Sequence, residues 1–305
     1  QNNLIQLELN RCAVGIKDNS KFMLPNSLED LSEMLLKNPE ATIVAGATDV
    51  GLWITKGLSS LSPLIFIGNL QELKTVTEYK RKIVLGACVT YSHAEKVFSN
   101  YLPSTKNYFA RIAGEQIRNV GTVGGNIGNG SPIGDLAPLF IALDATMRLR
   151  RGSECREIKV EEFFLDYNSQ DIKKSEFIES IQVPLRENIF VFPYKVSKRR
   201  DEDISTISAI FSFEILDNKM YDVRLVYGGM AGIPKRASKA EEVLEGKTFD
   251  SSIAKLAQLT LPSDFKPLSD LRASAEYRME VAKNLIIKCQ QEYSRRTSPK
   301  SVSPN

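Results

Sequence analysis

Residues 119–134 limit most strongly what this chain can fold into, because they contain six glycines in sixteen positions and no charged side chain. Glycine lowers the stability of a helix or strand interior, so this composition predicts a long loop. Loops of such length inside a compact domain usually carry function. We therefore expect residues 119–134 to form a functional loop that regular elements hold in place.

Short apolar runs alternate with helical patterns on both sides of this stretch, which predicts a mixed α and β fold. Strands are expected at residues 21–25, 42–45, 64–68, 73–78 and 82–87, and in a hairpin of residues 146–150 and 154–159 with its turn at Arg151-Gly152. Ser27 is expected to cap a helix that Asn38-Pro39 ends. Further helices are expected at residues 91–99, 104–113 and 135–143.

The sequence changes in character after Pro184, where long β-rich runs begin. These runs cover residues 190–198, 207–216 and 220–227, and Asp217-Asn218-Lys219 is the expected turn between the last two. Three helices are expected to follow, the last at about residues 271–293. A chain of 305 residues favours two domains. We place them at residues 15–188 and 189–294, and expect the Ser- and Pro-rich residues 295–305 to be disordered.

Composition argues against several classes of protein. The chain has 40 basic and 37 acidic residues and no long basic run, which gives no indication of a nucleic-acid partner. No apolar stretch approaches the ~20 residues of a membrane span, and no signal peptide is evident, so we expect a cytoplasmic protein without a membrane partner. The cysteines at 12, 88, 155 and 289 form no close pair, so no metal site or iron-sulfur site is expected on this chain.

Two conspicuous single residues are expected to have structural roles. His93 is the only histidine. It follows Thr90-Tyr-Ser without an evident catalytic partner, so we expect an exposed residue at a helix start. Trp53, the only tryptophan, is expected to pack in the core.

The segment Ile43-Val-Ala-Gly-Ala-Thr-Asp-Val-Gly51 is a candidate anion site. It places small residues between a buried strand and the start of a helix, which leaves backbone N–H groups free to face a phosphate. It matches neither the Walker loop nor the dinucleotide fingerprint. A plain strand-to-helix turn explains the same residues, so both interpretations stay open.

The segment Thr122-Val-Gly-Gly-Asn126 is a second candidate. It offers a hydroxyl, two adjacent glycines that permit close approach of the main chain, and an amide that can donate and accept. One ligand with a central diphosphate needs two such segments, and an extended dinucleotide has that shape. Glycines that serve only turn geometry are the alternative.

Together, Ile43 to Val50 and Gln116-Ile-Arg-Asn-Val-Gly-Thr-Val-Gly-Gly-Asn-Ile-Gly-Asn-Gly-Ser-Pro-Ile-Gly-Asp135 resemble the flavin domain of the molybdenum hydroxylases. This family includes xanthine dehydrogenases, aldehyde oxidases and carbon monoxide dehydrogenases. Gly51-Leu-Trp-Ile-Thr-Lys56, Phe163-Phe-Leu-Asp-Tyr167, Tyr227-Gly-Gly-Met230 and residues 265–278 resemble the small subunit of bacterial xanthine dehydrogenases. The resemblance covers about residues 22–288.

The resemblance implies an α+β fold. Its first part is a two-part FAD-binding domain of the vanillyl-alcohol-oxidase or PCMH type. A small C-terminal domain of the carbon monoxide dehydrogenase flavoprotein type follows, with a three-stranded sheet and helices.

The resemblance also implies FAD contacts. They fall at Ile43, Val44, Ala45, Gly46, Ala47, Thr48, Asp49, Val50, Ile112, Ala113, Thr122, Gly124, Gly125, Asn126, Asp135, Ile178 and Lys195. Residues 122–126 would hold the diphosphate region, and Ile112 falls where animal members carry an aromatic residue beside the isoalloxazine. Without the resemblance, Asp135 is equally an N-cap for the next helix, and Lys195 is a solvated surface lysine.

Arg200 and Glu202 lie in the charged run Lys198-Arg-Arg-Asp-Glu-Asp203. In the family this loop lies beside the flavin, so these two residues are candidates for tuning the flavin or controlling NAD access. From the sequence alone the run is a solvated loop.

The resemblance implies an oxidoreductase component of xanthine dehydrogenase, in purine catabolism. FAD on this chain would take electrons from [2Fe-2S] clusters of a partner domain or chain and pass a hydride to NAD. Purine hydroxylation would occur at a molybdenum cofactor on a large subunit, so no catalytic side chain is expected here. Two alternatives stay open: the flavoprotein of an aldehyde, carbon monoxide or heteroaromatic dehydrogenase, and an interaction scaffold without a cofactor.

Overall fold

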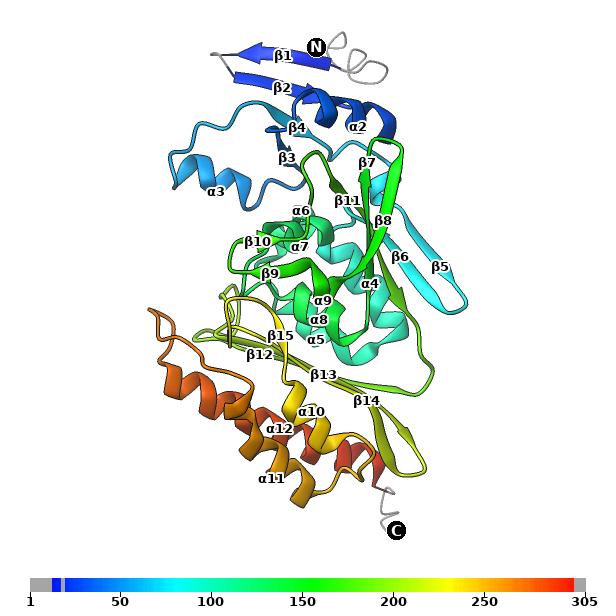
Figure 1. Cartoon of the computed structure of the whole chain (residues 1–305), viewed down its shortest axis with the longest axis vertical. Coiled ribbons are helices and arrows are strands. Elements are labelled where there is room, and N and C mark those ends of the chain that lie inside the picture. The colour runs from blue at the N-terminus through cyan, green and yellow to red at the C-terminus, as the bar shows by residue number, and fades with distance from the viewer. Residues whose placement is uncertain (1–12, 18–19, 299–305) are drawn as a thin grey trace, which may run out of the picture. The chain divides into compact units, whose positions relative to one another are not determined.

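A computed structural model of the chain describes residues 13–17 and 20–298, which form two compact units. The first unit consists of the described residues within Gln1–Ser131 and of Leu143–Leu185. The second consists of Pro132–Ala142 and the described residues within Arg186–Asn305. Figure 1 shows that each unit is built around β-sheet with helices packed on it. The expected mixed α+β fold is confirmed.

The first sheet of the first unit contains four strands in the order β1-β2-β4-β3. These strands are β1 (Ala13–Lys17), β2 (Ser20–Leu24), β3 (Thr42–Val44) and β4 (Leu64–Phe66), and β4 runs parallel to both β2 and β3. Helix α2 (Leu28–Lys37) buries Leu31, Met34 and Leu35. The Ser27 side chain accepts a hydrogen bond from the Asp30 N–H, so the predicted N-cap is confirmed.

The second sheet of this unit has five antiparallel strands in the order β5-β6-β11-β7-β8. They are β5 (Val76–Tyr79), β6 (Lys82–Gly86), β11 (Phe177–Pro184), β7 (Thr146–Arg151) and β8 (Glu154–Lys159). The predicted hairpin at residues 146–159 is confirmed, and Gly152 has the positive φ of 60° that its turn requires. The strand expected at residues 73–78 begins only at Val76, because Glu72–Lys74 forms a 3-10 turn, η1.

Short helices and one small hairpin complete the first unit. The helices are α3 (Val50–Thr55), α4 (Tyr91–Tyr101), η2 (Pro103–Thr105), α5 (Lys106–Ala110), α6 (Glu115–Val120), α7 (Val123–Asn129) and α9 (Val160–Phe163). The hairpin pairs β9 (Phe164–Asp166) with β10 (Ser169–Gln170). His93 is exposed in the first turn of α4, as predicted.

The prediction of a continuous loop at residues 119–134 is wrong for Val123–Asn129, which form α7. Thr122 caps this helix by accepting from the Gly125 N–H at 3.1 Å, and Gly130 ends it with a φ of 64°. A Cβ on Gly124 would lie 2.6 Å from the Ala87 Cβ. The glycine is therefore required by close packing of α7 on the segment after β6, and this contact offsets the low helix propensity of the sequence.

The second unit is built on one antiparallel sheet in the order β12-β13-β14-β15. The strands are β12 (Ile189–Val196), β13 (Ile207–Leu216), β14 (Lys219–Gly228) and β15 (Lys235–Arg236). The first three are the long strands that were expected, and the two-residue β15 adds a fourth strand at the edge of the sheet. Asp217 and Asn218 both have positive φ, 48° and 63°, which is the backbone of a two-residue hairpin turn.

Helices lie on both faces of this sheet. On β13, Phe211 and Phe213 belong to the large apolar core shared with α10 (Ser238–Leu244), α11 (Ser251–Thr260) and α12 (Ala275–Thr297). Ser212 lies between them and donates to the Ala142 carbonyl at 2.6 Å, at the end of α8 (Leu136–Ala142). Alternate residues of a strand face opposite sides of the sheet. The helix α8 therefore packs on one face, and α10 to α12 pack on the other.

Both ends of the last helix differ from the predicted range of about residues 271–293. Helix α12 begins at Ala275, because the Ser274 side chain accepts from the Tyr277 N–H and so caps the helix. It continues to Thr297, so the expectation of disorder is wrong for residues 295–297. Residues 299–305 of that tail, and Cys12, lie outside the described residues. No helix of the described part is long and apolar enough to span a bilayer.

Candidate cofactor site

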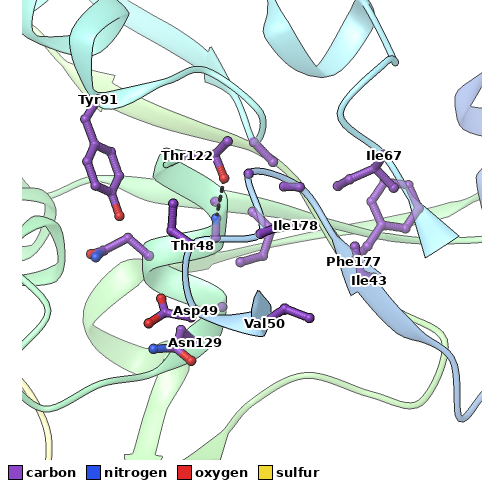
Figure 2. A pocket seen from close by; sticks show the side chains of 18 of the residues that line it. Ile43, Thr48, Asp49, Val50, Ile67, Tyr91, Thr122, Asn129, Phe177 and Ile178 are labelled. Carbon is purple, nitrogen blue, oxygen red and sulfur yellow. Dashed lines mark hydrogen bonds between the residues drawn. The ribbon is translucent and has the colours of Figure 1, made fainter. Parts of the chain in front are cut away.

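A cavity of about 230 Å³ lies in the first unit, between the β3–α3 loop, the start of α7 and strand β11. Figure 2 shows side chains from these segments converging on it. The residues that line it are Ile43, Ala45, Gly46, Ala47, Thr48, Asp49, Val50, Trp53, Ile67, Ala87, Tyr91, Thr122, Gly124, Gly125, Asn126, Gly128, Asn129, Ile172, Phe177 and Ile178. Both segments that the sequence singled out therefore border one cavity.

The β3–α3 loop presents unpaired main-chain donors beside the cavity. Within the described part of the chain, the N–H groups of residues 46–50 have no hydrogen-bond partner. Ala47 has a φ of 58°, in the left-handed region, which turns the main chain sharply between strand and helix. Successive main-chain N–H groups without partners form a concave site for an anion. This loop therefore has the character of a phosphate site.

Gly46 brings this loop into backbone contact with the second segment. A Cβ on Gly46 would lie 1.9 Å from the Val120 carbonyl oxygen and 3.2 Å from the Gly121 Cα. No side chain fits between two main chains at this distance. The glycine is therefore required where the β3–α3 loop crosses the junction of α6 and α7, and this contact sets the relative position of the two segments.

The start of α7 contributes less main chain to the cavity than the sequence suggested. The N–H groups of Val123 and Gly124 donate to the carbonyls of Val89 and Ala87, both at 2.9 Å. The Gly125 N–H donates to the Thr122 hydroxyl oxygen, which Figure 2 shows as a dashed line. Gly124 lines the cavity and also packs closely on Ala87, and its N–H is already used, so its contact with a ligand stays a prediction in which this N–H is not a free donor.

Apolar side chains form another wall of the cavity. Ile43 on β3 and Phe177 and Ile178 on β11 belong to it. Trp53 of α3 also lines the cavity and is 41% exposed, so the expectation that it packs in the core is wrong. Ile178 was expected at the site, whereas Ile67, Ala87, Tyr91, Gly128, Asn129, Ile172 and Phe177 were missed. These residues come from six separate places in the sequence, and no local pattern joins them.

Asp49 is the carboxylate among the residues that line the cavity. It precedes α3, but its side chain makes no capping hydrogen bond to that helix. Burial raises the pKa of the Asp49 carboxyl, because the charged form loses water.

Three expected residues of the first unit do not line this cavity. Val44 is buried within β3. Ile112 is buried, and Ala113 has a φ of 50°, between α5 and α6. Arg118 supports this segment: its Nη1 donates to the carbonyl of Ile112 at 3.1 Å and to that of Ala113 at 2.8 Å.

The second unit brings Asp135 and Lys195 together. The Lys195 Nζ lies 2.7 Å from an Asp135 carboxylate oxygen and 2.9 Å from the Ser205 hydroxyl, and that hydroxyl donates to Asp135 at 2.5 Å. All three residues are at most 7% exposed. The alternative of a solvated surface lysine is therefore wrong. Hydrogen bonds among all three groups make burial of this ion pair tolerable.

Arg200 and Glu202 also belong to the second unit, in the exposed turn between β12 and β13. Glu202 has a φ of 52°. The turn is held by Asp203, whose carboxylate accepts from the Arg199 N–H at 2.7 Å. This hydrogen bond is the main reason that the pKa of Asp203 lies below its ordinary value.

Comparison with known proteins shows related sequences over most of the chain. The chain is 30% identical over 256 residues to the xanthine dehydrogenase of Emericella nidulans, which matches 79% of this chain but spans 19% of that protein. It is 29% identical over 276 residues to the glyceraldehyde dehydrogenase medium chain of Sulfolobus acidocaldarius, covering 89% of this chain and 97% of the relative. The chain thus corresponds to about a fifth of one relative and to nearly all of the other.

A solved structure shows the same fold. A chain of the carbon monoxide dehydrogenase from Hydrogenophaga pseudoflava superposes with a TM-score of 0.83 at 24% identity, covering 88% of this chain and 94% of that one. The two-part FAD-binding fold with a small C-terminal domain is therefore confirmed.

Two family descriptions match successive parts of the chain. Residues 18–186 match the FAD binding domain in molybdopterin dehydrogenase, and residues 192–293 match the CO dehydrogenase flavoprotein C-terminal domain. The first match alone covers more than half of the sequence. The resemblance found in the sequence is thereby confirmed, and the chain belongs to the family of FAD-binding subunits and domains of the molybdenum hydroxylases.

Proposed function

We propose that this chain is the FAD-binding electron-transfer module of a xanthine dehydrogenase. One observation supports the FAD-binding part of the proposal: the main-chain N–H groups of residues 46–50 find no partner among the described residues, and they lie at a cavity that Thr122 and Gly125 also border. A diphosphate needs several hydrogen-bond donors close together, and the main chain of this loop supplies them. The described residues therefore fit a dinucleotide such as FAD.

The cavity matches part of a dinucleotide better than the whole. Its volume of about 230 Å³ is below the roughly 300–1,000 Å³ of sites that enclose a small molecule. We assign it to the diphosphate and the groups next to it, with the rest of the ligand outside it. The apolar side chains of Ile43, Phe177 and Ile178 would exclude water there.

The expected FAD contacts that do not line this cavity remain proposals, and for Val44, Ile112 and Ala113 the resemblance alone supports them. Bound FAD would supply hydride and single-electron exchange. Asp135 and Lys195 are proposed as contacts to it, although they already satisfy one another within the second unit. For Arg200 and Glu202, exposure on a fixed turn supports the proposed role in flavin tuning or NAD access. We further propose NAD as electron acceptor, a molybdenum-binding large subunit and an iron-sulfur domain or subunit as partners, and a cytoplasmic location.

A second candidate is the flavoprotein subunit of an aldehyde dehydrogenase of the same family. The glyceraldehyde dehydrogenase medium chain favours it, because that relative matches this chain over 97% of its own length. The xanthine dehydrogenase relative is similar in identity but much longer. Both candidates place the same cofactor in the same cavity and differ only in the partner that delivers electrons.

Two measurements test the proposal. The purified chain, with its partner chains if they co-purify, is denatured and the released flavin is identified by chromatography. Release of FAD is expected. A colourless protein that takes up no added FAD would refute flavin binding and favour the interaction scaffold. The assembled enzyme is then assayed for NAD reduction with xanthine and with aldehydes, and activity with aldehydes alone would favour the second candidate.

A further inference from the structure

Asp49 places a negative charge among main-chain groups suited to bind an anion. Its N–H is one of the five at residues 46–50 that have no partner in the described part of the chain, and its side chain lines the same cavity. A carboxylate accepts hydrogen bonds and repels phosphate oxygens. Its position is thus unfavourable unless the bound molecule offers a hydrogen-bond donor close to its phosphates.

Capping of helix α3 does not explain why a carboxylate stands at position 49. The N–H groups of Leu52 and Trp53 donate to the main-chain oxygen of Asp49, at 2.8 and 3.1 Å, and the side chain takes no part in capping. Aspartate at such a position usually stabilises the helix through its side chain. Here the carboxylate points into the cavity instead (Figure 2). Its raised pKa agrees with partial loss of water around it.

Asn129 lines the same cavity from the last turn of α7. Figure 2 shows its amide at the same end of the cavity as the Asp49 carboxylate. An amide both donates and accepts, whereas a carboxylate only accepts. A hydroxyl group can satisfy both, since it donates to the carboxylate and accepts from the amide.

The covalent structure of a dinucleotide indicates which of its groups could donate a hydrogen bond to the Asp49 carboxylate. The groups bonded directly to its diphosphate are sugars, a ribose on one side and a ribityl chain on the other, and the ring systems lie further away. Asp49 belongs to the loop that would bind the phosphates, so the sugars are the first donors within its reach. We propose that Asp49 and Asn129 form a subsite for sugar hydroxyls of the bound dinucleotide, an inference that rests on the proposed flavin site.

The test measures ligand binding by the full chain after its flavin has been removed. The variants are Asp49→Asn, Asn129→Ala and, as a matched control that removes a surface carboxylate of the same unit, Glu72→Gln. The probes are FAD, ADP, 2′-deoxy-ADP, FMN and inorganic pyrophosphate. Affinity is followed by quenching of flavin fluorescence and by displacement of FAD.

We expect Asp49→Asn to weaken FAD binding by about tenfold, the effect of losing one charged hydrogen bond. Pyrophosphate, which has no hydroxyl, is expected to bind Asp49→Asn as well as the unchanged chain or better, because the repelling charge is gone. Asn129→Ala is expected to weaken FAD binding less, and Glu72→Gln to change none of these affinities. A merely structural role of Asp49 would weaken pyrophosphate and FAD alike.

The probes also identify which sugar is bound. A ribose contact predicts that the unchanged chain prefers ADP over 2′-deoxy-ADP and that Asp49→Asn loses this preference. A ribityl contact predicts that only FMN and FAD weaken. Equal weakening of all five probes in Asp49→Asn, or no weakening of any, overturns the subsite. If the unchanged chain binds no FAD, it is instead the proposed function that fails.

Discussion

The substitution Gly46→Ala, which adds one methyl group, is the most direct test of the contact between the two segments that border the cavity. A Cβ there would lie 1.9 Å from the Val120 carbonyl oxygen, whereas real Cβ contacts essentially never fall below 3.0 Å. The two main chains would have to separate by about 1.1 Å, the difference between these distances. Neither neighbour is a flexible side chain, so the β3–α3 loop itself has to move.

We expect Gly46→Ala to affect both stability and binding. Overpacking of this kind lowers the free energy of unfolding by about 1–3 kcal/mol. The same shift displaces the main-chain donors of residues 46–50, and a misplacement of about 1 Å in a binding geometry reduces function by up to roughly a hundredfold. FAD affinity should therefore fall by about tenfold to a hundredfold, measured by fluorescence titration beside thermal unfolding.

Gly51→Ala is the matched control for this substitution. It adds the same methyl group on the same loop-and-helix segment, but a Cβ at Gly51 would meet no atom within 4 Å. Alanine in place of glycine in α3 should stabilise the helix by up to about 1 kcal/mol. If Gly46→Ala matches Gly51→Ala in both unfolding temperature and FAD affinity, the contact between the two segments does not organise the site.

Three further predictions concern stability. Lys195→Met leaves the Asp135 carboxylate buried without its cation and should lower the free energy of unfolding by about 3–5 kcal/mol in urea titration; a change below about 1 kcal/mol would mean that the pair is not buried in solution. Thr122→Val removes the N-cap of α7 and should cost about 1 kcal/mol, which unchanged urea midpoints would contradict. Burial raises the pKa of Asp270, but hydrogen bonds, chiefly from Arg278, bring it to about 2 from 3.8. Since this folded-state pKa is depressed, its stabilisation is present above about pH 4 and is lost as the pH falls toward 2. Asp270→Asn should therefore be destabilising at neutral pH and progressively less so toward pH 2, and a difference independent of pH would refute this.

Elements specified by neighbouring residues could be predicted from the sequence. The Ser27 cap and the Asn38 stop of α2, and the hairpin turns at Gly152 and at Asp217-Asn218, follow from the chemistry of a few adjacent residues. Each was found where the sequence indicated it. Local rules suffice here because the determining hydrogen bond or dihedral angle lies within the element itself.

Features that depend on distant contacts could not be predicted in this way. The helix α7 forms despite its glycines, because Gly124 packs against Ala87. Asn129 faces the cavity only because that helix exists. Helix α8 interrupts the first unit in sequence but packs on β13 and β14 of the second. In each case the partner that determines the structure is far away along the chain. The composition and periodicity of the local sequence therefore do not predict the contact.

The glycines of the two segments therefore have a different meaning from the one that the sequence suggests. Gly46 and Gly124 are required where one main chain meets another, and neither requirement involves a ligand. A cofactor-free scaffold with this fold would need the same two glycines. A ligand is indicated instead by groups that have no hydrogen-bond partner within residues 13–17 and 20–298: the N–H groups of residues 46–50 and the Asp49 carboxylate. Substitutions at Asp49 should consequently change ligand affinity while leaving the unfolding temperature nearly unchanged. Substitutions at Gly124, which packs on Ala87 in the wall of the cavity, should lower the unfolding temperature and the affinity together.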